Sequence, residues 1–399
     1  MKFLIINTDY SEFLSELYTQ HPGLCNASYD EQMNKRNESL FGTADFYSAN
    51  LIKLGNEAWD VHANNEFLQK KWVKEYYPDN IVLAEYKSNQ NSEISHLKKI
   101  SQTFPFKYLT RFSPLVTKYF DLNPSWYYSI LELQIQHYQP DIIWNHDFSL
   151  ADSFLKKIKT ENNFLIGQIA APIPQGINFK RYDLMISSLP NFVDYFRLLG
   201  VPSEFQKLSF EPKILSAFSN NTEKTIPISF VGSISKAHKT RTKWLEYICT
   251  ELEDGIIGVW GSGIQTMSGN SPIRKVFRGA AWGKDMYSIL KRSKITLNHH
   301  INISRDYANN MRLYEATGMG TFLITDWKKN LSDIFEPDKE VITYKTQEEC
   351  VEKIRYYLEN DKEREAIARA GQERTLKEHT YYNRMQELVE VINNYKKVI

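Results

Sequence analysis

The sequence predicts an α/β protein built from two doubly wound parallel sheets. Short runs of strand-forming residues alternate with helical segments along most of the chain, which is typical of β-α-β units. Some of these runs contain no polar residue, as Phe3–Ile6 shows, and this indicates strands buried on both faces of a parallel sheet. The chain has 399 residues, more than one hydrophobic core usually organises. We therefore expect two Rossmann-like domains.

The first domain is expected over residues 1–210. Its predicted strands are Phe3–Asn7, Trp59–His62, Asp141–Trp144, Phe164–Ile169 and Leu184–Ser187. Its predicted helices are Thr43–Leu54, a segment around Trp126–Leu133, Leu150–Ile158 and Phe192–Leu199. Residues Thr8–Gly42 form a polar, tyrosine-rich stretch that is too long for an ordinary connection. We expect this stretch to be a substrate-contacting loop with short helices.

The second domain is expected over residues 211–380. The composition becomes rich in Ser, Asn, Pro and Lys near Leu208–Asn221, and the alternation restarts with a strand at Ile228–Gly232. The further elements are strands at Ile256–Trp260, Ile295–Asn298 and Thr321–Thr325, and helices at Lys243–Leu252, Asp285–Lys291, Met311–Thr317 and Gln347–Glu378. A last helix, Tyr381–Lys397, is long enough to pack across the first domain, and we expect residues 381–399 to do so.

Charge, cysteine content and hydropathy exclude several classes of protein. Lys plus Arg number 49 and Asp plus Glu 48, so the formal net charge of +1 provides no global field for nucleic acid. Three widely spaced cysteines support neither a disulfide framework nor a zinc cluster. No stretch approaches the ~20 apolar residues that cross a bilayer. We expect a cytoplasmic protein with no nucleic-acid partner, no transmembrane segment and at most peripheral membrane contact.

A strand that ends in glycine and is followed by cations is the first candidate site. Ligands of open α/β sheets bind beyond the carboxyl ends of the strands. The strand at Phe230–Val231 ends in Gly232 and Ser233, and four cations follow without an intervening acid: Lys236, Lys239, Arg241 and Lys243. Glycine lets a phosphate approach the backbone, and cations with helix N-terminal amides then neutralise it. The alternative is a solvated start of a helix.

The helix predicted at Met311–Thr317 is the second candidate. Asn310 is a suitable N-cap, and Arg312 lies in the first turn, where a cation opposes the helix dipole unless an anion lies beside it. This conflict suggests an anion site. The alternative is a surface ion pair between Arg312 and Glu315 at i,i+3 spacing, worth a few tenths of a kcal/mol.

Other strand ends give weaker signals. His299 and His300 follow the strand at Ile295–Asn298; adjacent strand residues point to opposite faces, so we reject a metal pair and keep one of them as a cleft residue. In Gly261-Ser262-Gly263, the third glycine of a dinucleotide fingerprint would fall at Thr266, and no Walker A sequence exists. Chemistry based on NAD or ATP therefore loses support.

From Phe230 to about Arg384 the sequence resembles the C-terminal domain of GT-B glycosyltransferases of the retaining family-4 type (glycosyl transferases group 1), in particular the spore-maturation-protein CgeB-like branch. The residues that carry the resemblance are Phe230-Val231-Gly232-Ser233, Arg241, Met311-Arg312-x-x-Glu315-x-x-Gly318, His379-Thr380-Tyr381 and Arg384. It implies a GT-B fold, with two Rossmann-like domains facing a central cleft. It also implies that Glu315 grips the ribose of a nucleotide-sugar while the Gly232 loop and basic residues hold the diphosphate.

The resemblance has one departure and one further match. Many family-4 members carry a second acid eight positions before the ribose-binding acid; that position is Tyr307 here, and the adjacent Asp306 is the candidate substitute. The segment that ends in His146 and Asp147 looks like the strand-end histidine segment of many retaining GT-B enzymes, in which the histidine contacts the donor sugar. The alternatives are a structural histidine and an aspartate that caps the next helix.

Together these features predict a glycosyltransferase of polysaccharide biosynthesis that moves a sugar from a nucleoside diphosphate sugar to a glycan or similar acceptor, with retention, no metal and no cofactor. The catalytic candidates stabilise charge on the leaving diphosphate or contact the sugar: Arg312, Lys239, Arg241 and His146. The donor-binding candidates are Gly232, Ser233, Asn310, Glu315, Thr317 and Asp306. The acceptor-binding candidates are Tyr10, Tyr18 and Asp147. A nucleotide-sugar 2-epimerase and a non-catalytic glycan- or nucleotide-binding scaffold stay open as alternatives.

Overall fold

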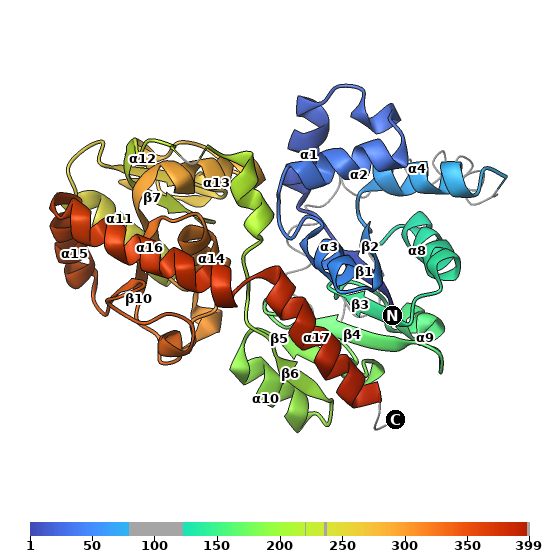
Figure 1. Cartoon of the computed structure of the whole chain (residues 1–399). Helices are drawn as coiled ribbons and strands as arrows, with labels where there is room; N and C mark the ends of the chain where they lie inside the picture. Colours follow the sequence, from blue (N-terminus) through green and yellow to red (C-terminus); the bar gives the residue numbers. More distant parts are fainter. Residues whose placement is uncertain (80–122, 220, 235–237, 397–399) are drawn as a thin grey trace. The chain divides into compact units, whose positions relative to one another are not determined.

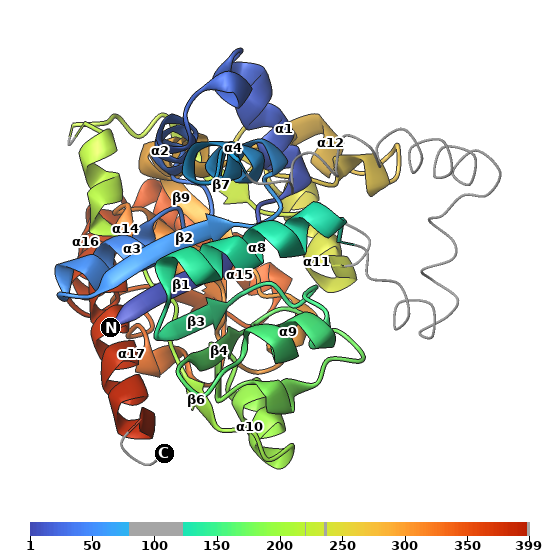
Figure 2. The ribbon, with the colours of Figure 1, turned by 90° about the vertical axis from the view of Figure 1, so that its right-hand side faces the viewer.

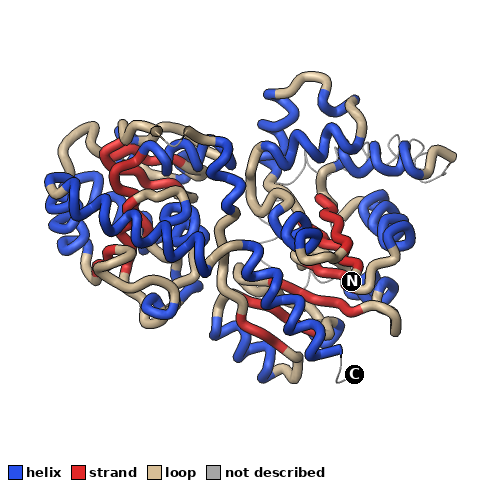
Figure 3. The backbone as a smooth tube through the Cα atoms, in the orientation of Figure 1, coloured by secondary structure: helices blue, strands red, loops and turns tan. Residues whose placement is uncertain are grey.

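The computed structural model describes residues 1–79, 123–219, 221–234 and 238–396. The chain forms two compact units. The first unit contains Met1–Glu38, Leu51–Ser187 and Asn191–Glu204; the second contains Ser39–Asn50, Ser188–Pro190 and Phe205–Ile399. Each unit has its own sheet, drawn as arrows in Figure 1 and as red segments in Figure 3. Lys236, one of the four candidate cations, lies outside the described residues.

The first unit is a six-stranded sheet in the order β2-β1-β3-β4-β5-β6. Its strands are β1 (Lys2–Asn7), β2 (Glu57–His62), β3 (Ile142–Asn145), β4 (Phe164–Gln168), β5 (Leu184–Ser187) and β6 (Ser203–Phe205). Its helices are α1 (Ser11–Gln20), α2 (Tyr29–Glu38), α3 (Phe46–Lys53, shared with the second unit), α4 (Glu66–Tyr76), α8 (Ser125–Tyr138), α9 (Asp152–Ile158) and α10 (Pro190–Leu198, likewise shared). Helices α8 and α9 lie on one face of the sheet (Figure 2).

The second unit is a five-stranded sheet in the order β11-β10-β9-β7-β8, with every neighbouring pair parallel. Its strands are β7 (Ile226–Val231), β8 (Ile257–Trp260), β9 (Ser293–Asn298), β10 (Phe322–Asp326) and β11 (Ile342–Tyr344). Its helices are α11 (Lys239–Glu251), α12 (Ile273–Val276), α13 (Gly283–Arg292), α14 (Met311–Gly318), α15 (Gln347–Glu359), α16 (Asp361–Glu378) and α17 (Tyr381–Lys396). Helices α11 and α15 pack together over the buried core, while α13 and α14 contact the strands and each other.

The predicted alternation of strands and helices is present, with several differences of detail. The stretch Thr8–Gly42 holds helices, as predicted, but two of them, α1 and α2, have ten residues each and make up about half of the stretch. The long helix predicted at Gln347–Glu378 is two helices, because α15 ends before Asn360 and α16 begins after it. Strand β11 has three residues, too few to produce a recognisable sequence pattern.

Among the described residues, no helix combines the length and the apolar character needed to cross a bilayer.

The strands of the second unit are all parallel, so their carboxyl ends lie at the same edge of the sheet. The order of the strands reverses at β7, because β8 lies on one side of it and β9 on the other. This is the place where open α/β sheets bind ligands.

Candidate functional site

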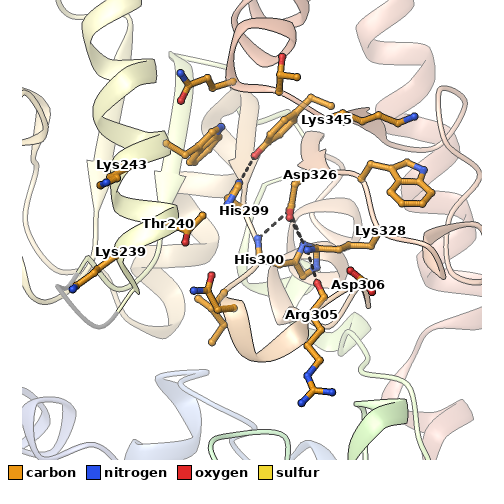
Figure 4. Close-up of a pocket in the computed structure, with 17 residues that line it drawn as sticks. Lys239, Thr240, Lys243, His299, His300, Arg305, Asp306, Asp326, Lys328 and Lys345 are labelled. Carbon is orange, nitrogen blue, oxygen red and sulfur yellow. Dashed lines mark hydrogen bonds and ion pairs between the residues drawn. The ribbon is translucent and has the colours of Figure 1, made fainter.

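A cavity of about 780 Å³ opens at this carboxyl edge of the second sheet (Figure 4). It is lined by residues that follow β9, β10 and β11 and by the first turns of α11. Its volume lies within the range of ligand sites for molecules of cofactor size. The lining residues are Lys239, Thr240, Lys243, Trp244, His299, His300, Ile301, Asn302, Arg305, Asp306, Asp326, Trp327, Lys328, Tyr344, Lys345, Thr346 and Gln347.

Five cations line this cavity, and they differ in how they are held. Lys328 Nζ lies 2.8 Å from the carbonyl oxygen of Arg305, to which it donates, and 3.3 Å from Asp326 Oδ2. Lys345 Nζ lies 5.5 Å from the centroid of the Trp327 ring. By contrast, within the described part of the chain the charged ends of the other three, Lys239, Lys243 and Arg305, have no hydrogen bond or ion pair. These three exposed cations are available to an anion.

A buried aspartate organises the floor of the cavity. Asp326 Oδ1 accepts hydrogen bonds from the backbone N of His300 at 2.9 Å and from His300 Nδ1 at 2.6 Å. Burial opposes ionisation of Asp326, but the His300 ring, with smaller contributions from His299 and Lys328, holds its pKa well below the usual range. Asp326 therefore fixes the ring of His300 and one of the five cations.

Both histidines line the cavity, although the sequence predicted that they would diverge. That prediction rests on the alternation of side chains along a strand, which applies only within the strand. Strand β9 ends at Asn298, so His299 and His300 belong to the loop that follows it. His299 packs on Trp244, with ring centroids 4.9 Å apart, and His300 bonds Asp326. Among the described residues, no group of three or more His, Cys, Asp or Glu side chains could hold a metal ion.

A second group of residues, next to the Gly232 turn, contains several of the residues predicted from the sequence. Arg312 Nη2 donates to the carbonyl oxygen of Val231 at 3.0 Å, directly before Gly232. Arg312 Nη1 lies 2.9 Å from Glu315 Oε2, and both side chains are only 10% exposed. Burial raises the pKa of Glu315, and the Arg312 charge opposes that rise. The pair has the predicted i,i+3 spacing but is buried rather than on the surface.

Asn310 and Arg241 also belong to this group of residues. Asn310 is the N-cap of α14, as predicted, because its side chain accepts from the backbone N of Arg312 at 2.8 Å. Arg241 donates to the carbonyl oxygen of Ser233, and burial, with the nearby Arg312 charge, lowers the pKa of Arg241 to about 10.

Thr317 and Asp306, also predicted donor contacts, lie in different environments. Thr317 is buried, and its hydroxyl bonds the Leu313 carbonyl oxygen and the Thr375 hydroxyl, both at 2.6 Å. It therefore joins α14 to α16 and is not among the residues that line the cavity. Asp306 does line the cavity and is exposed. Tyr307 occupies the position at which many family-4 members carry an acid. The centroid of its ring lies 4.1 Å from Lys329 Nζ.

Gly261 supports the Gly232 turn, a role that its sequence pattern did not reveal. Its φ of +148° lies in a region that residues with a side chain rarely adopt, and a Cβ built on it would lie 1.9 Å from the carbonyl oxygen of Gly232. The backbone N of Gly232 donates to the carbonyl oxygen of Trp260 at 2.9 Å. The glycine after β8 is therefore required by the close approach of two loops.

The acceptor candidates and His146 lie in the first unit. Tyr10 is 63% exposed, whereas the Tyr18 hydroxyl bonds Gln32 Oε1 and Asn65 Oδ1 at 2.9 Å each. The His146 ring lies 5.0 Å from the ring of Trp144, and burial lowers its pKa to about 3.

Asp147 stabilises a turn rather than capping the next helix. It is buried, accepts from the backbone N of Ser149 at 2.9 Å and bonds the Tyr127 hydroxyl. The N-cap of α9 is Ala151, so the expected alternative role as a helix cap is wrong. Both oxygens of Asp147 are thus used inside the first unit.

Comparisons with known proteins place the cavity in a recognisable domain. Residues 240–390 match a family model described as glycosyl transferase-like. These residues lie within the second unit. The matched segment includes the loops after β9, β10 and β11 that line the cavity, and it confirms the predicted glycosyltransferase class for this domain. A search of curated proteins finds no match to the chain.

Three solved structures are similar in fold to most or all of the chain. A glycosyltransferase from Rickettsia africae aligns with a TM-score of 0.55 at 11% identity, over 99% of each chain. HepE of Anabaena, solved with UDP and glucose, aligns with a TM-score of 0.52 at 11% identity, over 99% of this chain and all of the other. Sucrose-phosphate synthase of Thermosynechococcus elongatus aligns with a TM-score of 0.50 at 11% identity, over 69% of this chain and 78% of the other. These likenesses confirm the predicted GT-B fold.

Proposed function

We propose that this protein is a glycosyltransferase whose nucleoside diphosphate sugar donor binds in the cavity of the second unit. The observation that carries the proposal is the set of exposed, unpaired cations at the carboxyl edge of the sheet: Lys239, Lys243 and Arg305. A diphosphate needs such charges, and the cavity volume of about 780 Å³ suits a nucleotide-sugar. The match of residues 240–390 to a glycosyl transferase-like family supports the reaction class.

Helix α11 supplies the principal phosphate contacts in this proposal. Lys239 is its first residue, and Lys243 lies one turn further along. Backbone N–H groups at a helix N-terminus add to the attraction for an anion. Because two lysines and a helix N-terminus already supply positive charge, we propose that the reaction needs no divalent metal. Addition of EDTA should leave the turnover unchanged.

These cations also provide the catalytic effect. As the bond between the sugar and the diphosphate breaks, negative charge grows on the leaving oxygens, and fixed cations stabilise that charge more than they stabilise the ground state. In this proposal Arg312 and Arg241 act indirectly. They donate hydrogen bonds to the carbonyl oxygens of Val231 and Ser233, on either side of Gly232. They hold the shape of the Gly232 turn.

The finer features rest on the sequence resemblance. We propose retention of the anomeric configuration, membership of the CgeB-like branch, and a glycan acceptor bound by the first unit through Tyr10 and neighbouring residues. The cytoplasmic location also stays a prediction. The comparisons do not favour a 2-epimerase or a non-catalytic scaffold, and within the described residues we find no feature that specifically supports either.

The proposal is tested by incubating the protein with UDP-, GDP- and dTDP-glucose and measuring release of nucleoside diphosphate by mass spectrometry. UDP-glucose is the first probe because the HepE structure holds UDP and glucose. We expect slow hydrolysis of at least one donor and its loss in Lys239→Ala/Lys243→Ala. An anomeric proton spectrum of the released sugar reports retention. Absence of both binding and hydrolysis for all three donors would refute the proposed function.

A further inference from the structure

A short hydrogen-bond relay fixes the protonation pattern of His299. The Tyr344 hydroxyl donates to the carbonyl oxygen of Asn298 at 3.0 Å, and the same hydroxyl lies 2.9 Å from His299 Nδ1. A tyrosine hydroxyl has a single hydrogen, and here it points to Asn298, so the tyrosine oxygen accepts from His299. His299 Nδ1 therefore carries the proton, and in the neutral ring Nε2 is an acceptor.

The ring of His299 is held in one orientation by the aromatic side chains around it. It stacks on Trp244 at a centroid distance of 4.9 Å and an interplanar angle of 19°. Trp244 is itself parallel to Tyr344, at 5.7 Å and 2°. Both of these partners belong to the buried core of the second unit. The direction in which Nε2 points is therefore set by the core.

His299 differs from its two partners because it is half-buried and lines the cavity (Figure 4). Within the described part of the chain, its Nε2 atom has no hydrogen-bond partner. Burial, with the nearby positive charges, lowers the pKa of His299 to about 4, although Asp326 opposes the shift. The ring is therefore neutral at pH 7, and the acceptor atom is available to a ligand.

His299 Nε2 is a hydrogen-bond acceptor in a cavity whose lysine and arginine side chains can only donate hydrogen bonds. Lysine and arginine side chains have no acceptor atom, so Lys239, Lys243 and Arg305 bind anionic oxygens but leave the hydrogen of a hydroxyl unpaired. We infer that His299 Nε2 accepts a hydrogen bond from a hydroxyl of a sugar ring joined to the diphosphate in this cavity. The inference rests on the proposed function. Within that function, His299 is a specificity-determining residue and Tyr344 is the residue that positions it.

Proton abstraction is a poor alternative role for His299. A general base works best with a pKa near the working pH, and a pKa of about 4 is roughly three units too low. A hydrogen-bond acceptor needs no such match. His299 should therefore affect binding and discrimination of the sugar more than the rate of the chemical step.

Two substitutions of His299 distinguish the roles of its two ring nitrogens. In His299→Asn the amide nitrogen replaces Nδ1 and still donates to Tyr344, but nothing remains at the position of Nε2. In His299→Gln the amide reaches the position of Nε2 and its oxygen can accept. We expect His299→Asn to lose about tenfold in affinity and His299→Gln to recover most of it. Affinities are measured by calorimetry and folding by thermal melting.

The probes are UDP and UDP-glucose, with the GDP and dTDP pairs measured in parallel. A loss for UDP-glucose but not for UDP identifies the hydroxyl as one on the transferred sugar; an equal loss for both identifies it as one on the ribose. Equal affinities of wild type and His299→Asn for both members of a pair that binds would overturn the inference and leave the proposed function standing. Failure of the wild type to bind any probe would overturn both.

Two further measurements apply if the asparagine variant does not fold. Tyr344→Phe keeps the stacked ring but removes the group that fixes the protonation of Nδ1, so it should reduce the affinity for the same probe as His299→Asn does. In the wild type, the ¹⁵N resonance of the unprotonated ring nitrogen of His299 should shift when that probe is added. An unchanged resonance in the bound protein, or a ring protonated on Nε2, would contradict the inference.

Discussion

Two charged groups lie near the carboxyl edge of the second sheet, and they differ in how their charges are neutralised. The Arg312–Glu315 pair is buried, and Arg312 also bonds the backbone of β7. In the cavity, Lys239 and Lys243 are exposed and, within the described residues, unpaired. The first group therefore serves the structure of the Gly232 turn, and the second is available to a ligand.

This difference shows what charge patterns in a sequence reveal. A cation in the first turn of a helix indicates a neighbouring anion, and for Arg312 that anion is Glu315 of its own helix. Spacing alone does not distinguish an internal partner from a bound phosphate. Burial distinguishes them, because a buried cation has already exchanged water for protein partners.

The largest effect is expected for Arg312→Ala. The substitution leaves the Glu315 carboxylate buried without its cation, and loss of one partner of a buried pair costs about 3–5 kcal/mol. Urea unfolding at pH 7 measures the change in the free energy of unfolding. Arg374→Ala is the matched control, since Arg374 pairs with Glu378 at 3.0 Å on a partly exposed helix face and should cost less than about 1 kcal/mol. Equal costs for the two variants would show that Arg312 does not act as a buried structural cation.

Gly261→Ala should be the next most damaging change. A Cβ at this position would lie 1.9 Å from the carbonyl oxygen of Gly232, so one of the two loops has to move. We expect a loss of about 2–4 kcal/mol in unfolding free energy together with weaker donor binding. Gly269→Ala is the control, because a Cβ there meets nothing within 4 Å. A Gly261 variant as stable as the control would refute the close approach of the two loops.

Because the pKa of Asp326 is lowered in the folded protein, we expect the free energy of unfolding to depend on pH in a specific way. Its folded pKa is lowered, so its stabilisation is complete above the unfolded value of ~3.9 and is lost as the pH falls through the folded pKa. At pH 7, Asp326→Asn should cost about 1–3 kcal/mol, because it removes the charge that His300 and Lys328 face. From pH 5 to pH 2 the wild type should lose more stability than the variant. Parallel curves in acid-dependent urea unfolding would contradict this.

Removal of a cavity lysine should affect ligand affinity with little effect on folding. Lys239→Ala and Lys243→Ala should each weaken binding of the best nucleoside diphosphate about tenfold, or about 1.4 kcal/mol, because each removes one charge-assisted contact. Melting temperatures should stay close to that of the wild type. Lys339→Ala, which removes a lysine side chain that is 71% exposed and pairs with Glu336, is the control and should bind normally. Affinity losses of the same size in the control would place the phosphates elsewhere.

The sequence predicts most of the fold because the evidence for it is local. Uninterrupted apolar runs such as Phe3–Ile6, and helix boundaries such as Asn310, depend on neighbouring residues and were predicted correctly. The strand β11 was missed because three residues carry no periodicity. The division of Gln347–Glu378 into two helices, at Asn360, was also missed.

The candidate site was only partly predictable, because it depends on which strand ends meet. The Gly232 turn and Arg312 were predicted to lie together, and the structure places them in contact through Val231. Asp326 was overlooked, since an aspartate at the end of one strand gains meaning only when a histidine follows the neighbouring strand. Likewise, no local pattern places Tyr344 beside His299.

We propose that the exposed cations of the second unit hold the diphosphate of a nucleotide-sugar. A crystal structure of the protein with UDP-glucose, or with whichever sugar nucleotide binds best, tests this proposal. We expect phosphate oxygens within hydrogen-bond distance of Lys239 or Lys243, and a sugar hydroxyl on His299 Nε2. A bound nucleotide that leaves the side chains of Lys239, Lys243 and Arg305 untouched would contradict it.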